Sequence, residues 1–427
     1  MARYNSYKDS GVKWLGEIPS HWEIGKMREF FSERKELSTD GKEKLLSVSE
    51  YTGITPSINE NGENISRSAS LVGYKKCKAT DLIINIMLAW KRGLGISSFD
   101  GIVSPSYCVF STKGINPCFA NYLLRTDLFI SEFKRNSTGI IESRLRMYPD
   151  DFKNIQCINP PLEEQKAIVE YLDKVTGDID KVIEAQQKLI DALNERKQII
   201  ITNAVTRGLD PTVQLKDSGI DWLGQIPKTW EVSKIKRHSK VILGKMLDSK
   251  GGNLSKIFPY ICSKDVNFDS IDLTDLKEMF FSEKEIEQYK VSNGDLLVVE
   301  GGSAGKCCIA KNIDKTIGIQ NSILIIREER SLLNTFLAYQ LQSLVKKGFV
   351  ESSCNKATFL HYTKEKVENT NIALPLIEEQ KEIVKYIDDN ISPLNAQITN
   401  CEKMISLLQE RKQIIINDVV TGKKKVI

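Results

Sequence analysis

Two stretches of the sequence place glycines beside basic or hydroxyl side chains, each directly after a short β-branched run. The first stretch follows residues 81–87 and the second follows residues 295–299. Glycine lets a backbone approach a ligand closely, and neighbouring lysine or arginine suits phosphate oxygens or guanine edges. The alternative is that both are ordinary tight turns. The residues that would make contacts here are Trp90, Lys91 and Arg92 in the first stretch and Ser303 and Lys306 in the second.

A second basic segment lies further along each half of the chain. Residues 136–146 carry Arg144 and Arg146, and the segment that matches them in place carries Asn355 and Lys356. Asparagine and lysine suit adenine and guanine edges respectively, although basic residues in polar loops are usually just solvated. We expect most of these cations to meet phosphates and only a few side chains to distinguish bases.

Residues 159–162 look like the active-site tetrapeptide of amino methyltransferases, in which an amide and two prolines precede an aromatic residue. Leu162 replaces the aromatic residue that would stack on a flipped base. No glycine-rich cofactor loop follows an upstream strand. We therefore expect this segment to be the start of a helix.

Residues 300–306 resemble a phosphate-binding loop but fail its requirements. Glu300 stands in place of the first glycine, and Cys307 follows the lysine where Ser or Thr is required. The nine cysteines contain no C-x-x-C pair and read as reduced thiols rather than metal ligands. His21, His238 and His361 occupy unmatched positions in the two halves. We expect no catalytic residue, no metal and no cofactor.

The composition is that of an ordinary globular chain. It has 427 residues, of which 41% are hydrophobic and 27% charged, with a formal net charge of +4. This length suggests two or three domains, and so small a net charge neither establishes nor excludes nucleic acid as a partner. No apolar run approaches the ~18 residues of a membrane span, and the first residues lack the apolar core of a signal peptide. We expect a cytoplasmic protein that does not contact a membrane.

The elements that must position these loops belong to a module that occurs twice. Its offsets, 208 residues (14 to 222) and 215 residues (163 to 378), suit a duplicated domain and are far longer than a solenoid repeat. The repeated motifs are W-L-G-x-I-P (14–19 and 222–227), E-E-Q-K (163–166 and 378–381) and E-R-K-Q-I-I-I (195–201 and 410–416).

A helical pattern follows Pro161 in the first half and Pro375 in the second. Each pattern has an acidic first turn and apolar residues spaced by four and three, which is typical of a coiled-coil seam. Because residues 176–178 and 392–393 interrupt the pattern, we expect a short helix, a break and a helix of about 28 residues, roughly 42 Å long. The predicted seam residues are Ile168, Leu172, Ile179, Leu189, Leu193, Ile383, Ile387, Leu394 and Leu408.

The paired helices have two interpretations. In one they only stiffen the molecule. In the other they hold two domains at a set distance, and leftover apolar residues dock another subunit. The candidates for docking are Ile199, Ile201, Ile414 and Ile416.

Between the repeated ends lie two divergent middles, residues 24–160 and 232–375. Both contain short β-branched runs separated by Gly, Asn and Ser, which favour strands. Each middle ends with a predicted helix, at 118–134 and at 332–347. The fold class is therefore α+β, with two tandem α/β domains joined by two long antiparallel coiled-coil helices in a pseudo-two-fold repeat.

This arrangement resembles the specificity subunit of type I restriction-modification systems. The features that carry the resemblance are two variable domains, two similar helical spacers that start at P-x-x-E-Q, a glycine loop after a D-L-L-type strand, and the W-L-G-x-I-P opening. The resemblance covers nearly the whole chain. It implies a non-catalytic subunit that binds double-stranded DNA, with each target-recognition domain reading one half of a split, asymmetric site. It also implies that the helices set the gap and recruit two methyltransferase subunits, and that restriction and translocation subunits join the full complex.

The resemblance divides the chain into a target-recognition domain at 1–160, a helical spacer at 161–208, a second target-recognition domain at 209–375 and a second spacer at 376–427. Two other hypotheses remain. A coiled-coil scaffold would not bind DNA, and a remnant of a fused restriction-modification enzyme would carry nuclease or methyltransferase motifs, which we do not find.

Overall fold

The computed structural model describes two compact units, each of which combines one divergent middle with part of both long helices. Unit 1 comprises Met1–Gln187 and Glu402–Ile427, and unit 2 comprises Lys188–Cys401. The residues outside the description are Met1, Glu60, Arg67, Ala69, Asn253, Asp269, Arg330, residues 354–360 and Ile427, together with the side chains of Ser143, Glu351 and Ser353.

The two spacers are single uninterrupted helices. Helix α5 (Leu162–Arg207) has 46 residues and α10 (Ile377–Val420) has 44, or about 69 and 66 Å at ~1.5 Å per residue. The expected breaks are therefore wrong. Thr176, inside the first predicted break, and Leu394, next to the second, are each 6% exposed. We attribute the continuity to this burial, because tertiary packing routinely overrides low helix propensity.

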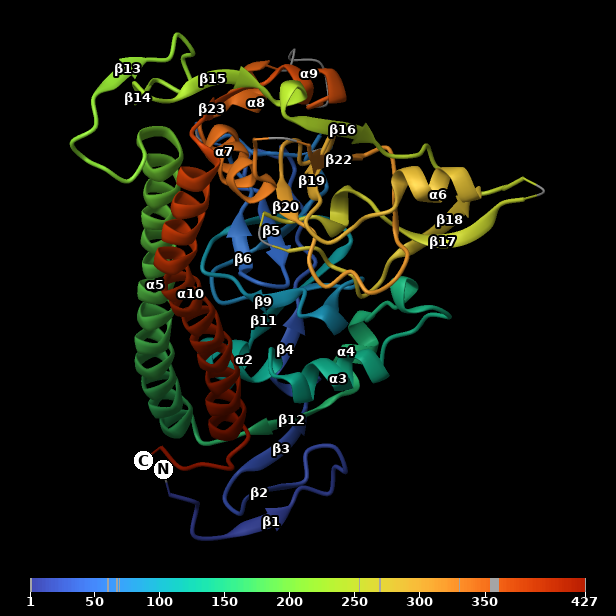
Figure 1. The fold of residues 1–427 in the computed structure, drawn as a ribbon. Coiled ribbons are helices and arrows are strands. Elements are labelled where there is room, and N and C mark those ends of the chain that lie inside the picture. The colour runs from blue at the N-terminus through green and yellow to red at the C-terminus, as the bar shows by residue number, and fades with distance from the viewer. Residues whose placement is uncertain are drawn as a thin grey trace. The chain divides into compact units, whose positions relative to one another are not determined.

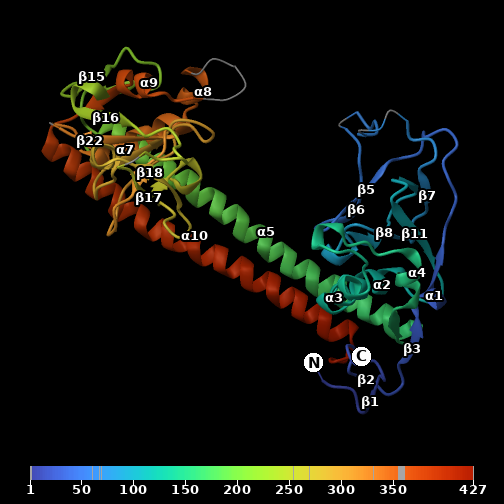
Figure 2. The same ribbon diagram turned by 90° about the vertical axis from the view of Figure 1, so that its right-hand side faces the viewer.

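Helices α5 and α10 lie side by side and run antiparallel within each unit (Figure 1; Figure 2). In unit 1 the beginning of α5 shares a core with the end of α10, and in unit 2 the end of α5 shares a core with the beginning of α10. The residues involved are Ile168, Leu172, Val419 and Val420 in unit 1, and Ile201, Val205, Ile383 and Ile387 in unit 2.

The predicted seam residues divide into three groups. Ile179 and Leu408 are partly exposed. Leu189 is 46% exposed, and its neighbour Ile190, which is 7% exposed, lies in the seam instead. The same one-residue shift occurs two heptads earlier, where Thr176 is buried and Val175 is only partly buried. The buried members of the predicted set are Ile168, Leu172, Leu193, Ile383, Ile387 and Leu394.

Two of the four isoleucines expected to dock a partner are part of the cores. Ile201 is 1% and Ile416 is 8% exposed, whereas Ile199 and Ile414 are 53% and 49% exposed. Only the latter two present apolar surface.

Unit 1 is built around a sheet in the order β4-β11-β8-β9. Strand β3 pairs with β12 at the base of the long helices, and β1 pairs with β2 in the hairpin of the W-L-G-x-I-P motif. The strands are β1 (Tyr7–Asp9), β2 (Glu17–Pro19), β3 (Glu23–Lys26), β4 (Phe31–Glu33), β5 (Leu46–Ser49), β6 (Gly53–Pro56), β7 (Lys75–Cys77), β8 (Leu82–Asn85), β9 (Leu94–Ile96), β10 (Gly101–Val103), β11 (Tyr107–Thr112) and β12 (Gln156–Asn159). The shorter helices are α1 (Met27–Phe30), η1 (Ala89–Lys91), α2 (Pro117–Leu124), α3 (Asp127–Arg135), η2 (Glu142–Arg144) and α4 (Pro149–Asn154).

Unit 2 repeats this plan with the sheet β16-β22-β19-β20. Unit 1 also has the two-stranded sheets β5-β6 and β10-β7, and unit 2 has the three-stranded sheet β18-β17-β21. Strand β15 pairs with β23, as β3 pairs with β12. The strands are β13 (Leu215–Asp217), β14 (Gln225–Pro227), β15 (Glu231–Lys234), β16 (Ser239–Leu243), β17 (Lys256–Ile261), β18 (Lys277–Phe281), β19 (Leu296–Val299), β20 (Cys307–Ile309), β21 (Gly318–Ile319), β22 (Ile323–Glu328) and β23 (Asn371–Leu374). The shorter helices are η3 (Ile235–Arg237), η4 (Ser263–Asp265), α6 (Glu283–Tyr289), α7 (Asn334–Lys346), α8 (Phe349–Ser353) and α9 (Lys364–Asn369).

The fold class expected from the sequence is confirmed in both units. The helix expected at 332–347 is α7, whereas the helix expected at 118–134 is two helices, α2 and α3. The division occurs at Thr126, whose side chain accepts a hydrogen bond from the backbone N–H of Phe129 and so begins a new helix.

Candidate nucleic-acid interface

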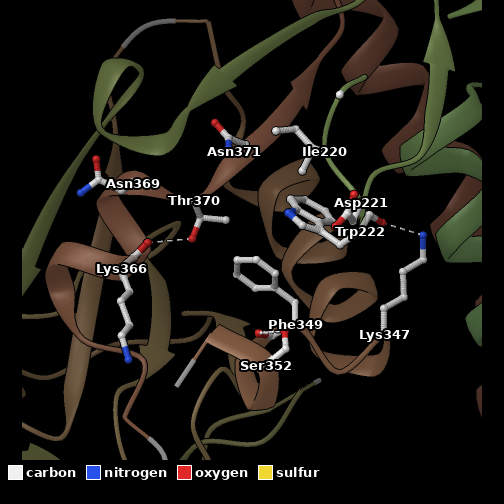
Figure 3. Close-up of a pocket in the computed structure, with 11 residues that line it drawn as sticks. Ile220, Asp221, Trp222, Lys347, Phe349, Ser352, Lys366, Asn369, Thr370 and Asn371 are labelled. Carbon is white, nitrogen blue, oxygen red and sulfur yellow. Dashed lines mark hydrogen bonds between the residues drawn. The ribbon is translucent and has the colours of Figure 1, made fainter. Parts of the chain in front are cut away.

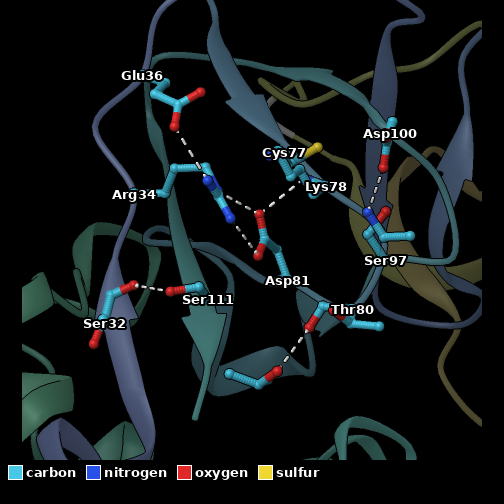
Figure 4. Close-up of polar contacts among 12 residues, drawn as sticks. Ser32, Arg34, Glu36, Cys77, Lys78, Thr80, Asp81, Ser97, Asp100 and Ser111 are labelled. Atoms are coloured by element: carbon cyan, nitrogen blue, oxygen red, sulfur yellow. Dashed lines mark hydrogen bonds and ion pairs between the residues drawn. The ribbon is translucent and has the colours of Figure 1, made fainter.

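A buried ion pair fixes the strand that precedes the first glycine loop. Asp81 is 2% exposed and directly precedes β8. Its carboxylate accepts two hydrogen bonds from Arg34, at 2.7 Å from Nε and 3.2 Å from Nη2, and a third from the backbone N–H of Lys78 at 2.8 Å (Figure 4). Asp295, at the same place before β19, pairs with Arg327 at 3.2 Å. Such charge-assisted, two-point contacts hold both strands in a defined position.

The loop between β8 and β9 is anchored by two arginines that exchange hydrogen bonds. Arg92 has a φ of 60° and donates from Nε to the carbonyl of Arg125 at 3.2 Å, and its guanidinium also pairs with Asp127. Arg125 donates to the carbonyls of Arg92 at 3.2 Å and Glu50 at 2.9 Å. Burial, and then the charge of Arg92, lower the pKa of Arg125. The guanidinium of Arg92 is thus engaged by the protein itself.

Trp90, in contrast, is partly exposed, and its ring is flanked by cations. The ammonium of Lys91 lies 4.9 Å and that of Lys134 lies 5.5 Å from the ring centroid. The indole N–H donates to the carbonyl of Met87 at 3.0 Å. Lys134 also pairs with Glu142, and this ammonium, with a smaller effect of Lys91, lowers the pKa of Glu142. An aromatic ring between lysines is a surface suited to a nucleic acid.

The structure brings the second basic segment of unit 1 beside this loop. The backbone N–H of Met147 donates to the carbonyl of Ile86 at 2.8 Å. Thr138 and Arg146 exchange two backbone hydrogen bonds, each of 2.9 Å, which close the loop between them. Arg144 is exposed within that loop, and Arg146 donates from Nη1 to the carbonyl of Leu145 at 3.0 Å. Trp90, Lys91, Arg144 and Arg146 therefore belong to two joined loops.

Unit 2 joins its glycine loop to the following segment in the same way. The backbone N–H of Tyr362 donates to the carbonyl of Glu300 at 2.7 Å. Gly305 has a φ of 87°, and a Cβ there would lie 2.6 Å from Val345, so this position requires glycine. Ser303 is exposed and Lys306 is half-buried in the loop. The candidates Asn355 and Lys356 lie outside the described residues.

The near-miss motifs have structural roles. Asn159 ends β12, and its side-chain oxygen accepts a hydrogen bond from Gln165 at 2.8 Å. Burial raises the pKa of Glu300, opposed by the nearby charge of His361.

Within the described part of the chain no three His, Cys, Asp or Glu side chains gather in a way that could hold a metal. The described cysteines are free thiols, of which Cys118 is exposed.

A cavity of about 790 Å³ lies in unit 2 beside the second W-L-G-x-I-P motif (Figure 3). The rings of Trp222 and Phe349 are tilted, with centroids 5.6 Å apart. Lys347 donates to the carbonyl of Trp222 at 2.9 Å, and burial lowers its pKa. In unit 1 the corresponding Trp14 packs edge-on against Phe129 at 5.0 Å. In both units this motif therefore fastens its hairpin to the domain by a tryptophan.

Comparison with known proteins identifies the class of this fold. The model of the type I restriction modification DNA specificity domain matches twice, at residues 19–192 and 227–402. The chain belongs to this family, and the resemblance inferred from the sequence is confirmed.

Relatives of the same kind match over all or part of their length. The type I restriction enzyme MjaVIII specificity subunit of Methanocaldococcus jannaschii is 26% identical over 98% of this chain and 97% of its own. The type I restriction enzyme EcoBI specificity subunit of Escherichia coli is 26% identical over 58% of this chain and 53% of its own. A chain from a structural study of complex assembly and conformational transition in the type I restriction-modification system has the same fold, with a TM-score of 0.67 at 17% identity over 94% of this chain and 98% of that one.

None of the helices in the described residues is both long enough and apolar enough to cross a lipid bilayer.

The sequence interpretation missed part of the candidate interface. It did not include Lys134 and Glu142, which lie on different elements from Trp90 and reach it only in the folded chain. It also omitted Ile140 and Ile141, although two adjacent isoleucines in a polar loop are an anomaly visible in the sequence.

Proposed function

We propose that this chain is a non-catalytic DNA-recognition subunit that reads a two-part, asymmetric site, one half with each unit. The observation that supports it is the same junction of two loops in both units, made by Met147 with Ile86 and by Tyr362 with Glu300. The scaffold is repeated, but the side chains differ, with Trp90 and Lys91 in one unit and Ser303 and Lys306 in the other. Two units with the same backbone arrangement but different contact side chains would recognise different half-sites.

In these loops, different residues would provide affinity for DNA and recognition of its sequence. Lys91 and Arg144 are exposed cations that would neutralise phosphates and make affinity depend steeply on salt. Base edges would be read by the residues held most firmly beside them, because direct readout requires fixed geometry. In unit 1 the candidate is Arg146, whereas the ring of Trp90, whose N–H already donates to Met87, would stack on a base rather than read its edge. In unit 2 the candidates are Ser303, which is exposed in the glycine loop, and, from the sequence alone, Asn355 and Lys356.

The test is to express the chain with its neighbouring methyltransferase subunit and to map methylated positions in the host DNA by single-molecule sequencing. We expect methylation at a split, asymmetric motif that disappears without this chain. Trp90→Ala with Lys91→Ala should relax or abolish recognition of one half of the motif, and Ser303→Ala with Lys306→Ala should affect the other half. Methylation that persists unchanged without the chain would leave the coiled-coil scaffold as the better hypothesis.

The long helices would set the gap between half-sites and dock two methyltransferase subunits. Each helix carries an exposed stripe at matching positions, 189, 196 and 199 on α5 and 404, 411 and 414 on α10. Leu189, Ile199, Met404 and Ile414 are 46 to 53% exposed, and Arg196 and Arg411 are exposed beside them. A duplicated apolar stripe suits two copies of one partner. Restriction and translocation subunits would join this complex, which acts on DNA in the cytoplasm.

A further inference from the structure

Two isoleucines at the tip of a loop in unit 1 are exposed to solvent. Ile140 is 100% and Ile141 is 53% exposed. Adjacent apolar residues in such a position are a marker of an interaction site rather than of a core. They belong to the loop that Thr138 and Arg146 close, beside the candidate DNA-contacting residues.

The loop holds these two side chains out in a defined conformation. The backbone at Gly139 passes so close to Arg144 that a Cβ at position 139 would lie 2.6 Å from the Arg144 carbonyl oxygen. The N–H of Leu145 donates to the carbonyl of Glu142 at 3.1 Å. Glu142 pairs with Lys134 of α3, which fastens the tip to the domain.

The surroundings of the isoleucines identify the kind of partner. Lys91 and Arg144 are exposed, and Lys134 and Arg146 lie on the same joined loops and helix; the one carboxylate in these two loops, Glu142, is paired with Lys134, so the surface keeps an excess of cations. A neutral protein surface would not require this concentration of cations. A DNA duplex combines a charged exterior with an apolar stack of bases, and so it matches both the cations and the isoleucines.

We propose that Ile140 and Ile141 act as a wedge that enters between adjacent base pairs of the half-site bound by unit 1. This proposal rests on the proposed function. Exposed apolar side chains that unstack a base step make deformability of that step part of what is recognised. The wedge would therefore add specificity at a step whose base edges no side chain reads.

The experiment uses the full chain with its methyltransferase partner and duplexes of the mapped target that carry 2-aminopurine at one position at a time. Its fluorescence rises where a base is unstacked. We expect a rise at one step of the unit 1 half-site, lost in the double variant Ile140→Ser, Ile141→Ser and retained in Ile140→Leu. Binding of the serine variant to the target should be at least about tenfold weaker. The methyltransferase also flips its target base, and that signal should persist in every variant, which shows that the complex is intact.

The outcomes separate the two proposals. If the wild-type complex does not prefer the target over a scrambled duplex, the proposed function fails and the wedge fails with it. If the target is preferred but the serine variant keeps the wild-type fluorescence profile, only the wedge is overturned.

Discussion

Gln165 and Gln380 show how a single side chain connects each domain to its spacer helix. Both belong to the repeated E-E-Q-K motif and both are 0% exposed. Gln380 donates to the carbonyls of Ser331 at 2.7 Å and Pro375 at 2.9 Å and accepts from the N–H of Leu333 at 2.9 Å. Gln165 likewise bonds the backbone on both sides of it, accepting from Asn116 at 2.7 Å and donating to Pro160 at 2.7 Å.

We predict that Gln380→Ala lowers the free energy of unfolding of unit 2 by about 2 kcal/mol or more, because it leaves buried backbone groups without hydrogen-bond partners. Gln397→Ala, at an exposed position of α10 in the same unit, should change stability by less than about 0.5 kcal/mol. Urea denaturation of the purified chain measures both. Equal stability of the two variants would mean that water replaces the carboxamide.

Lys91 and Arg92 are neighbours in the sequence with different surroundings in the structure, since Lys91 lies over the ring of Trp90 and Arg92 pairs with Asp127. The sequence nominates both as DNA contacts, since both are basic and follow a strand, but it does not show that Arg92 pairs with Asp127. That pairing depends on α3, more than thirty residues further on. The sequence could identify this loop as a candidate DNA contact. It could not show which of its side chains bond to the protein itself and which are exposed.

We therefore predict opposite phenotypes for two alanine variants. Lys91→Ala should leave the Tm unchanged, weaken DNA binding and reduce the salt dependence by about one counterion. Arg92→Ala should lower the Tm, because it releases Arg125 and Asp127 from their partner. Thermal unfolding and fluorescence anisotropy at several salt concentrations measure these effects. Loss of binding to one half-site in Arg92→Ala with an unchanged Tm would restore Arg92 as a direct DNA contact.

At the scale of elements, the strands could be predicted from their β-branched runs, but the continuity of the spacer helices could not. Glycine and proline lower local helix propensity, and from sequence alone this reads as a break. What decides the outcome is whether the seam on either side is buried, and that depends on residues more than 200 positions away. Thr176 is buried in such a layer, so the helix continues past Gly177.

Gly177 offers a direct test of this explanation. Its φ is not positive, and a Cβ there would meet nothing within 4 Å. Gly177→Ala should therefore stabilise unit 1 by about 0.5–1 kcal/mol by restoring helix propensity and restricting the unfolded chain. Urea denaturation measures the change.

The matched control is Gly422→Ala at the end of α10 in the same unit. Gly422 has a φ of 78°, and its Cβ would lie 2.5 Å from Pro19, so alanine should destabilise there. If Gly177→Ala also destabilises, α5 is distorted at the predicted break.

At the scale of the whole molecule, the duplication could be predicted from the repeated motifs. The division of the two long helices between the compact units could not. Each compact unit takes its spacer from both halves of the sequence, so unit 1 includes the end of α10 and unit 2 the end of α5. In unit 1 the chain ends also meet, since the N–H of Lys425 donates to the carbonyl of Ala2 at 2.9 Å. The spacing of apolar residues indicates which face of a helix packs against a partner. It does not indicate which part of the chain supplies that partner.

The duplicated stripe on the helices leads to a prediction of stoichiometry. If two identical methyltransferase subunits dock through the stripes, a charge placed in one stripe should remove one of them. Ile199→Asp or Ile414→Asp alone should give complexes with one methyltransferase per chain, and the double variant should give none. Both isoleucines are about half exposed, so the substitutions should not disturb the cores. Native mass spectrometry of co-expressed complexes counts the subunits.

Gln409→Asp, which introduces the same charge on the other side of the α10 seam, should retain two. If both single variants also retain two subunits, the methyltransferases dock elsewhere and the stripes have another role.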